Sequence, residues 1–152
     1  MQSFRDLSIK RKLPGSPEIV TSEEAIFDTD LLRGDEKVLV IADVDRFRKI
    51  LFEMLERHGY DVHLGLDIRD GLSLFEIDRE NIDMVVIDLS MPDMSSEEVL
   101  GELLALHPEV RVLVVTGFTM DSTPWHGAKA VLNKPFKTYH LLRTVRQVLD
   151  AG

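Results

Sequence analysis

The stretch Ile82-Asp83-Met84-Val85-Val86-Ile87-Asp88 decides the fold of this 152-residue chain. Its four consecutive apolar residues, 84–87, are followed at once by a carboxylate. An uninterrupted apolar run of this length, rich in β-branched residues, is typical of a strand that is buried on both faces. Such strands occur in parallel sheets that carry helices on both sides, so we expect an α/β protein.

The chain on either side of this stretch alternates between strand patterns and helix patterns. Asp45 and Thr138 are predicted to cap the first and last helices. Regular strand–helix alternation indicates a doubly wound parallel sheet covered by helices on both faces. Strands are predicted over 38–41, 62–64, 84–88, 110–116 and 130–132, and helices over 47–55, 72–77, 97–104 and 141–149.

Composition and charge exclude several classes of function. The chain has no cysteine, which excludes a disulfide scaffold, a thiolate zinc site and a cysteine nucleophile. Its net charge of −9 argues against a nucleic-acid partner or an anionic membrane surface. No apolar run approaches the roughly 20 residues that span a bilayer, and no signal peptide is recognisable, so we expect a cytoplasmic protein without membrane insertion.

The first 36 residues differ from the rest of the chain. Their charge is segregated, with a net +3 over 1–17 and −6 over 18–36, and Pro14-Gly15-Ser16-Pro17 breaks any regular structure. The capping-box pattern Thr21-Ser22-Glu23-Glu24 predicts at most a short helix near 22–32. We therefore expect 1–36 to be an N-terminal tail or linker and 37–152 to form one domain.

Polar residues follow four of the predicted strands at the point where each strand ends. They are Asp43, Asp88, Thr116 and Lys134-Pro135. The carboxyl ends of parallel strands meet at one edge of a sheet, where ligands of such folds bind. Paired carboxylates bind Mg²⁺, a metal and a lysine neutralise a phosphoryl group, and a carboxylate can itself form an acyl phosphate.

These residues, in this order, resemble the receiver domain of two-component response regulators. The resemblance covers residues 37–152 and implies a flavodoxin-like, five-stranded parallel sheet with the strand order 2-1-3-4-5. The pieces that carry it are the strand 38–43, the stretch 82–88, Met91-Pro92, Val115-Thr116-Gly117 and Lys134-Pro135-Phe136.

The resemblance implies a phosphoacceptor rather than an enzyme. Asp88 would accept a phosphoryl group from a phosphohistidine on a histidine kinase or phosphotransfer protein. Asp43, Asp88 and the backbone carbonyl of Ser90 would bind Mg²⁺. Any catalysis would be limited to the domain's own phosphorylation and dephosphorylation.

The resemblance also assigns roles to the ends of the last two strands. Thr116 would turn toward the phosphoryl group, and Lys134 would pair with it. The peptide bond between Lys134 and Pro135 is often cis in this family.

Three departures from the family pattern alter these expectations. Ala42 stands where receivers usually have the first of two acids, so we expect weaker Mg²⁺ binding. Val131 stands in place of the usual switch aromatic. Only ten residues separate Thr116 from Gly127, so the fourth helix is predicted to be shortened or missing.

The sequence leaves three functions open. The first is a phosphorylatable receiver, and the second is a degenerate receiver that acts as a phosphorylation-independent interaction module. The third is a small enzyme on the same fold. It is disfavoured because residues 42–45 lack a phosphate-cradling glycine and because Ser90 stands where a dehalogenase-type phosphatase needs a second aspartate. The output is expected to be contact with an unknown protein partner, and a homodimer is left open.

Overall fold

The computed structural model describes residues 29–88, 96–117 and 127–151, without the side chains of 96 and 97. The chain divides into two units, residues 1–32 and 33–152. In the first unit, the described part is a 3-10 helix, η1 (Thr29–Leu32). It coincides with the end of the helix predicted near 22–32, and the rest of that prediction lies outside the described residues.

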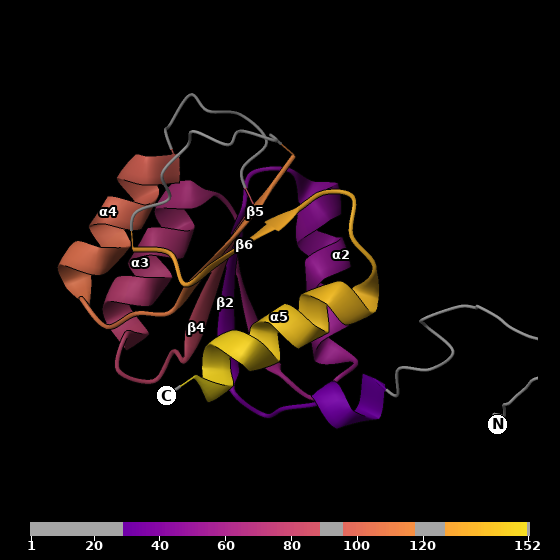
Figure 1. The fold of residues 1–152 in the computed structure, drawn as a ribbon. Helices are drawn as coiled ribbons and strands as arrows, with labels where there is room; N and C mark the ends of the chain where they lie inside the picture. The colour runs from indigo at the N-terminus through magenta and orange to yellow at the C-terminus, as the bar shows by residue number, and fades with distance from the viewer. Residues whose placement is uncertain (1–28, 89–95, 118–126, 152) are drawn as a thin grey trace, which may run out of the picture. The chain divides into compact units, whose positions relative to one another are not determined.

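The second unit is built on a five-stranded parallel sheet (Figure 1). The strands lie in the order β3-β2-β4-β5-β6, which is the predicted order 2-1-3-4-5 when they are numbered along the chain. The flavodoxin-like fold class is therefore confirmed. The strands are β2 (Lys37–Ala42), β3 (Asp61–Gly65), β4 (Met84–Asp88), β5 (Val112–Thr116) and β6 (Ala130–Asn133).

Four α-helices of the described residues cover this sheet, α2 and α5 on one face and α3 and α4 on the other (Figure 1). The three central strands are therefore enclosed on both sides, which explains their uninterrupted apolar runs. All five residues of β4 are buried. The helices are α2 (Asp45–Glu56), α3 (Ile68–Asp78), α4 (Ser96–Leu106) and α5 (Thr138–Asp150).

The predicted caps of α2 and α5 are wrong by one residue. Val44 and Lys137 occupy the N-cap positions, so Asp45 and Thr138 are the first residues inside their helices. Asp45 instead places a negative charge in the first turn, where it complements the helix dipole. It also forms an ion pair of 2.7 Å with Arg48 one turn later.

The connection from β5 to β6 is the place where a fourth helix is predicted to be shortened or missing. Gly117 and residues 127–129, the described parts of this connection, are not helical. Residues 118–126 lie outside the described residues.

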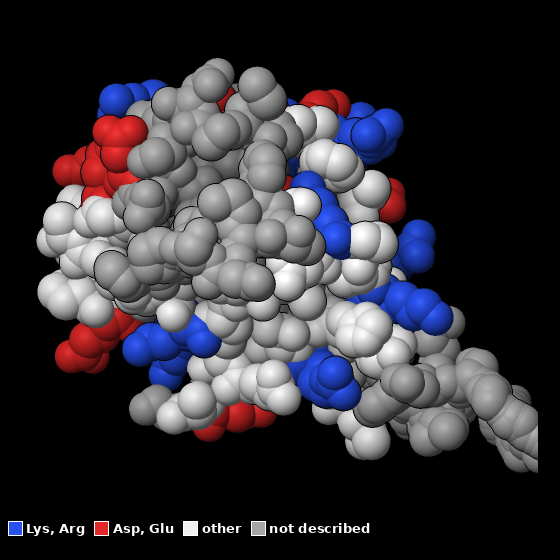
Figure 2. Space-filling model, turned by 45° about the horizontal axis from the view of Figure 1, so that its top comes forward, with Lys and Arg blue, Asp and Glu red and all other residues white. Residues whose placement is uncertain are grey.

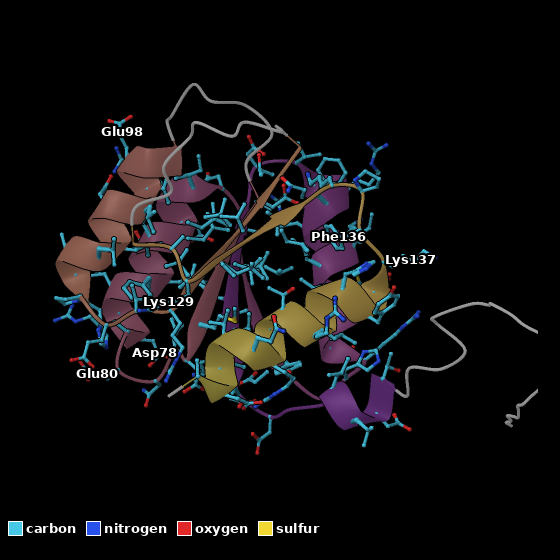
Figure 3. All side chains as sticks on the ribbon, in the orientation of Figure 1. Asp78, Glu80, Glu98, Lys129, Phe136 and Lys137 are labelled. Carbon is cyan, nitrogen blue, oxygen red and sulfur yellow. The ribbon has the colours of Figure 1, made fainter. Side chains whose placement is uncertain are left out.

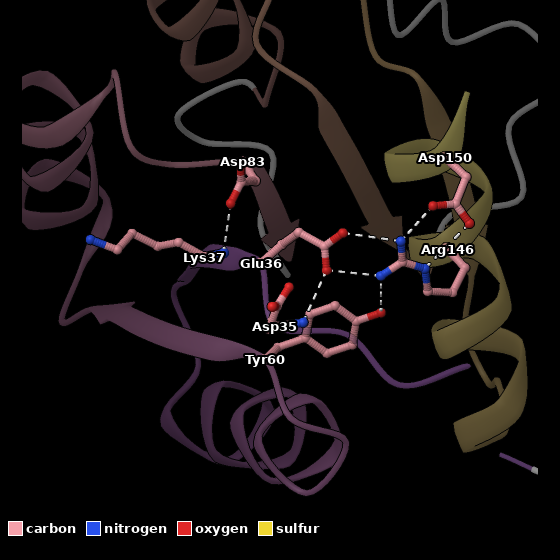
Figure 4. A network of polar contacts seen from close by, with 7 residues as sticks. All are labelled: Asp35, Glu36, Lys37, Tyr60, Asp83, Arg146 and Asp150. Atoms are coloured by element: carbon pink, nitrogen blue, oxygen red, sulfur yellow. Dashed lines mark hydrogen bonds and ion pairs between the residues drawn. The ribbon is translucent and has the colours of Figure 1, made fainter. Parts of the chain in front are cut away.

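A polar network joins the segment before β2 to α5 (Figure 4). The Arg146 guanidinium donates to both carboxylate oxygens of Glu36, at 2.8 and 3.0 Å, and to the Tyr60 hydroxyl at 3.2 Å. It also pairs with Asp150. The hydrogen bonds from Arg146 lower the pKa of the Glu36 carboxyl, and burial raises the pKa of Tyr60.

The backbone of this segment and of Lys37 also forms hydrogen bonds within the second unit. Gly34 N–H donates to the carbonyl of His58 at 3.1 Å, and a Cβ at Gly34 would lie 2.4 Å from Arg146 Nη1. Lys37 donates its backbone N–H to Asp83 and pairs its ammonium with Asp78, at the end of α3, at 2.7 Å (Figures 3 and 4). Residues 33–36, which sequence reasoning places in the extension, are thus part of the second unit.

Candidate functional site

The register of the sheet brings the four predicted strand-end residues to one edge. Asp88 lies directly opposite Ala42 in the pairing of β4 with β2, so Asp43 follows immediately beyond this pair. Thr116 pairs with Asn133 in the last two strands, and Lys134 N–H donates to the Thr116 carbonyl at 2.8 Å. The carboxyl ends of β2, β4, β5 and β6 therefore form a common rim, as predicted.

Asp88 is the most enclosed polar residue of this rim. Its side chain is 2% exposed, and Lys134 Nζ lies 2.7 Å from its Oδ1. Among the described residues, Oδ1 has no partner besides this ammonium. Burial raises the pKa of Asp88, and the charge of Asp43 adds to this, while Lys134 opposes it.

Asp43 is exposed and directly follows β2. Its negative charge contributes to the raised pKa of Asp88, because like charges disfavour the ionised form. The turn that carries it is held by Arg48, which donates to the Ala42 carbonyl and to Asp45, each at 2.7 Å. Sequence reasoning missed Arg48, although its spacing of three from Asp45 is a recognisable helix-pair signal.

A second missed residue is Phe47, in the first turn of α2. Lys134 Nζ lies 3.6 Å from the centroid of its ring. In the sequence, Phe47 is one of several apolar residues at helical spacing. An aromatic residue one turn after a strand-end carboxylate is a signal that could have marked it.

The remaining predicted site residues occupy different environments. Thr116 is 4% exposed at the end of β5, and Ala42 is fully buried. Val131, in place of the switch aromatic, is 41% exposed on β6. The peptide bond between Lys134 and Pro135 is cis. Ser90, whose carbonyl was expected to bind metal, lies outside the described residues.

The residues present fit a magnesium ion. Two carboxylates lie at the rim. Lys134 compensates part of the buried charge of Asp88, but burial and the charge of Asp43 still raise the pKa of this carboxyl, so a second cation would be favoured beside it. The described residues contain no group of three His, Cys, Asp or Glu side chains suited to a metal. A metal here would therefore bind through two carboxylates and further oxygen donors, which suits a hard cation that retains water ligands.

Charge is unevenly distributed around the rim. Figure 2 tips the upper edge of Figure 1 forward and shows Lys and Arg side chains along the right-hand side of the view. Asp and Glu side chains gather at the upper left. Figure 3 places Lys137 on the connection between β6 and α5, on the side of α2, and Glu98 on α4. The start of α2 also carries the exposed Asp43 and Asp45, so both signs of charge occur on this side of the rim.

The comparisons with known proteins identify a family for this chain. Residues 38–146 match the family model of the response regulator receiver domain. The chain is 28% identical to the sensor kinase CckA of Brucella abortus over 146 residues, 93% of this chain but 15% of that protein. It is also 28% identical to the response regulator receiver protein CpdR of the same organism over 123 residues, 77% of this chain and 99% of that protein.

A solved structure shares the fold. The response regulator receiver domain protein from Clostridium thermocellum superposes with a TM-score of 0.70 at 27% identity, over 76% of this chain and 95% of that one. Among the helices of the described residues, none is long and apolar enough to cross a membrane. The chain belongs to the response regulator receiver domain family, whose members are phosphoacceptors of two-component systems rather than classical enzymes.

Proposed function

We propose that Asp88 accepts a phosphoryl group from a phosphohistidine on a histidine kinase or phosphotransfer protein. One observation carries this proposal. The most enclosed carboxylate of the rim, 2% exposed, is joined by an ammonium at 2.7 Å. A structural ion pair at the surface would leave both groups in water, whereas this carboxylate is desolvated at the edge where ligands of such sheets bind.

The chemistry follows from these groups. A carboxylate oxygen of Asp88 attacks the phosphorus, a P–O bond forms, and the P–N bond to the donor imidazole breaks. The electron pair of that bond leaves with the imidazole nitrogen, and the product is an acyl phosphate. Lys134 neutralises charge on the phosphoryl oxygens, and its ammonium is already in place before the donor arrives.

Asp43 and Asp88 would hold Mg²⁺, together with the backbone carbonyl of Ser90. The ion supplies positive charge that screens the donor phosphoryl group from the two carboxylates. Ala42 provides no third carboxylate opposite Asp88, so one acid fewer than usual would bind the metal ion. We therefore expect binding to be weak.

The signal is a change in affinity for a protein partner. An acyl phosphate adds negative charge beside Thr116, a buried hydroxyl at the end of β5 that can donate to it. Val131 has no aromatic ring, so it cannot couple phosphorylation to the output surface as a switch aromatic does. The output is therefore expected to use another surface of the domain. Loss of the phosphoryl group requires attack of water on phosphorus, with the P–O bond to Asp88 breaking.

The proposal is tested by ¹H–¹⁵N NMR of the full chain with Mg²⁺ and beryllofluoride, a mimic of a phosphoryl group on aspartate. We expect the amide signals of Asp88, Thr116 and Lys134 to shift. The Asp88→Asn variant, treated in the same way, is the control and should not respond. If the wild-type spectrum is unchanged as well, the proposal fails, and the phosphorylation-independent interaction module is favoured.

A further inference from the structure

The ammonium of Lys134 is held from two sides. Its Nζ lies 2.7 Å from Asp88 Oδ1 and 3.6 Å from the centroid of the Phe47 ring. Asp88 comes from the end of β4, and Phe47 comes from the first turn of α2. A cation within about 6 Å of a ring centroid is attracted by the negative face of the ring. The two contacts therefore restrain Nζ independently of each other.

We propose that Phe47 is a positioning residue that keeps the Lys134 ammonium at the phosphoryl site while Asp88 changes from a carboxylate to an acyl phosphate. The inference rests on the proposed function. It adds a residue that touches neither the reacting oxygen nor the phosphoryl group. Its role is exerted through Lys134.

An aromatic ring suits this task because it carries no net charge. A carboxylate at the position of Phe47 would also attract Lys134, but it would repel an incoming phosphoryl group. The ring attracts the cation without that cost. Lys134 is 22% exposed, so part of its ammonium faces water and its long stem needs a restraint.

The contact between Phe47 and Lys134 matters because the reaction changes the charge of Asp88. When Asp88 Oδ1 or Oδ2 becomes bonded to phosphorus, the carboxylate loses the full charge that paired with Nζ. The ammonium then has to stay in reach of the phosphoryl oxygens. The Phe47 contact does not depend on the state of Asp88, so it persists through the change.

The surroundings of Phe47 are consistent with a role toward cations. The guanidinium carbon of Arg46 lies 5.2 Å from the centroid of the same ring. Arg46 is exposed, whereas Phe47 is partly buried. The ring thus contacts two cations, the exposed Arg46 and Lys134 of the rim, and the distance from its centroid to Lys134 is the shorter.

The test compares Phe47→Leu, which removes the ring at similar volume, with Phe47→Tyr, which keeps it. The first readout is the ¹H shift of the Lys134 ε-methylene in the resting full-length protein. A ring face this close shifts these protons upfield. We expect Phe47→Leu to abolish the upfield shift and Phe47→Tyr to retain it.

The second readout is the rate of phosphorylation by acetyl phosphate with Mg²⁺. Phe47→Leu should lower it roughly two- to fivefold, the range expected for a partly exposed cation–π contact, and Phe47→Tyr should restore it. Phe52→Leu is the matched control. It makes the same change on the same helix five residues later, which turns the side chain about 140° away. It should leave both readouts unchanged.

The outcomes separate the two proposals. If the wild type is not phosphorylated, the proposed function fails, and the methylene shift still shows whether Phe47 holds Lys134. If the wild type is phosphorylated and Phe47→Leu matches it in rate, the positioning role is overturned. An equal loss in Phe47→Leu and Phe47→Tyr, or in Phe52→Leu, would also overturn it, since a packing defect would then explain the loss.

Discussion

Lys134 Nζ lies 2.7 Å from Oδ1 of Asp88, so the buried carboxylate of the resting site already has a cationic partner. The two residues come from the ends of β4 and β6, which are separated by β5 in the sheet. Lys134 spans this distance because it follows β6 and its backbone N–H is bound to the Thr116 carbonyl at 2.8 Å. The ion pair is thus a consequence of the strand order.

Asp88→Asn is expected to raise the free energy of unfolding at pH 7 by roughly 0.5–2 kcal/mol. Burial raises the pKa of Asp88, so the folded state binds its proton more tightly than the unfolded state. The tighter proton binding stabilises the folded state fully at pH values below the unfolded pKa of about 4. This stabilisation is lost as the pH rises through the folded pKa. The wild type at pH 7 therefore bears the cost of a buried carboxylate. Urea denaturation without Mg²⁺ measures the difference.

The increase in the free energy of unfolding caused by Asp88→Asn should shrink as the pH falls toward about 4. The wild-type carboxyl is then increasingly protonated in both the folded and the unfolded state. Asp35→Asn, at an exposed position, is the matched control and should stay within about 0.5 kcal/mol of the wild type. A difference that is the same at every pH would contradict the assignment of the gain to the buried charge.

Lys134→Met should lower the free energy of unfolding at pH 7 by roughly 1–3 kcal/mol, because it leaves a buried carboxylate without its partner. In the double variant with Asp88→Asn, most of this loss should disappear, since no charge remains to be compensated. The double-mutant cycle measures the coupling, for which we expect about 1–3 kcal/mol. Strict additivity of the two changes would show that the ion pair contributes nothing.

Arg146→Met tests the network that joins the segment before β2 to α5. Loss of the two hydrogen bonds to Glu36 should cost roughly 1–2 kcal/mol at pH 7. Because Arg146 lowers the pKa of Glu36, this stability is present above the unfolded pKa of about 4.3 and is lost as the pH falls through the folded pKa.

The difference between the wild type and Arg146→Met should therefore be complete at pH 7 and narrow below about pH 4. Lys49→Met is the control, because it removes a surface ion pair of 3.7 Å from a lysine that is 74% exposed. It should change stability by less than about 0.5 kcal/mol. A larger effect of Lys49→Met than of Arg146→Met would contradict the account.

Ala42→Asp restores a carboxylate opposite Asp88. Mg²⁺ affinity, measured by calorimetric titration, should rise by about tenfold, because a third negative charge then faces the metal. Without Mg²⁺ the same variant should be less stable by roughly 1–3 kcal/mol, since like charges would be crowded at a buried position. Ala42→Asn adds the same volume without charge, and a gain in affinity as large as that of Ala42→Asp would refute the electrostatic explanation.

The sheet was predictable because burial on both faces leaves a plain pattern. The runs at 38–41 and 84–88 are apolar at every position up to the polar strand end, and β2 and β4 form there. The rim was predictable for the same reason, because parallel strands present their carboxyl ends together. The strand order came from the resemblance, since apolar runs do not state which strands are neighbours.

The contacts that were not predicted join residues without a shared local pattern. Glu36 and Arg146 are 110 residues apart, and nothing near Glu36 marks it as part of the domain. The contact of Phe47 with Lys134 depends on how α2 packs beside the connection after β6. The caps at Asp45 and Thr138 were displaced by one residue, because several polar residues near a helix start can satisfy the same pattern.

The most direct test of the central claim is phosphorylation of the full chain by acetyl phosphate with Mg²⁺, followed by mass spectrometry of the intact protein and its peptides. We expect one phosphoryl group, located on Asp88, that is removed by hydroxylamine as an acyl phosphate is. Asp88→Asn should take up none. A wild-type chain that stays unmodified, or a phosphoryl group that persists in Asp88→Asn, would contradict the account.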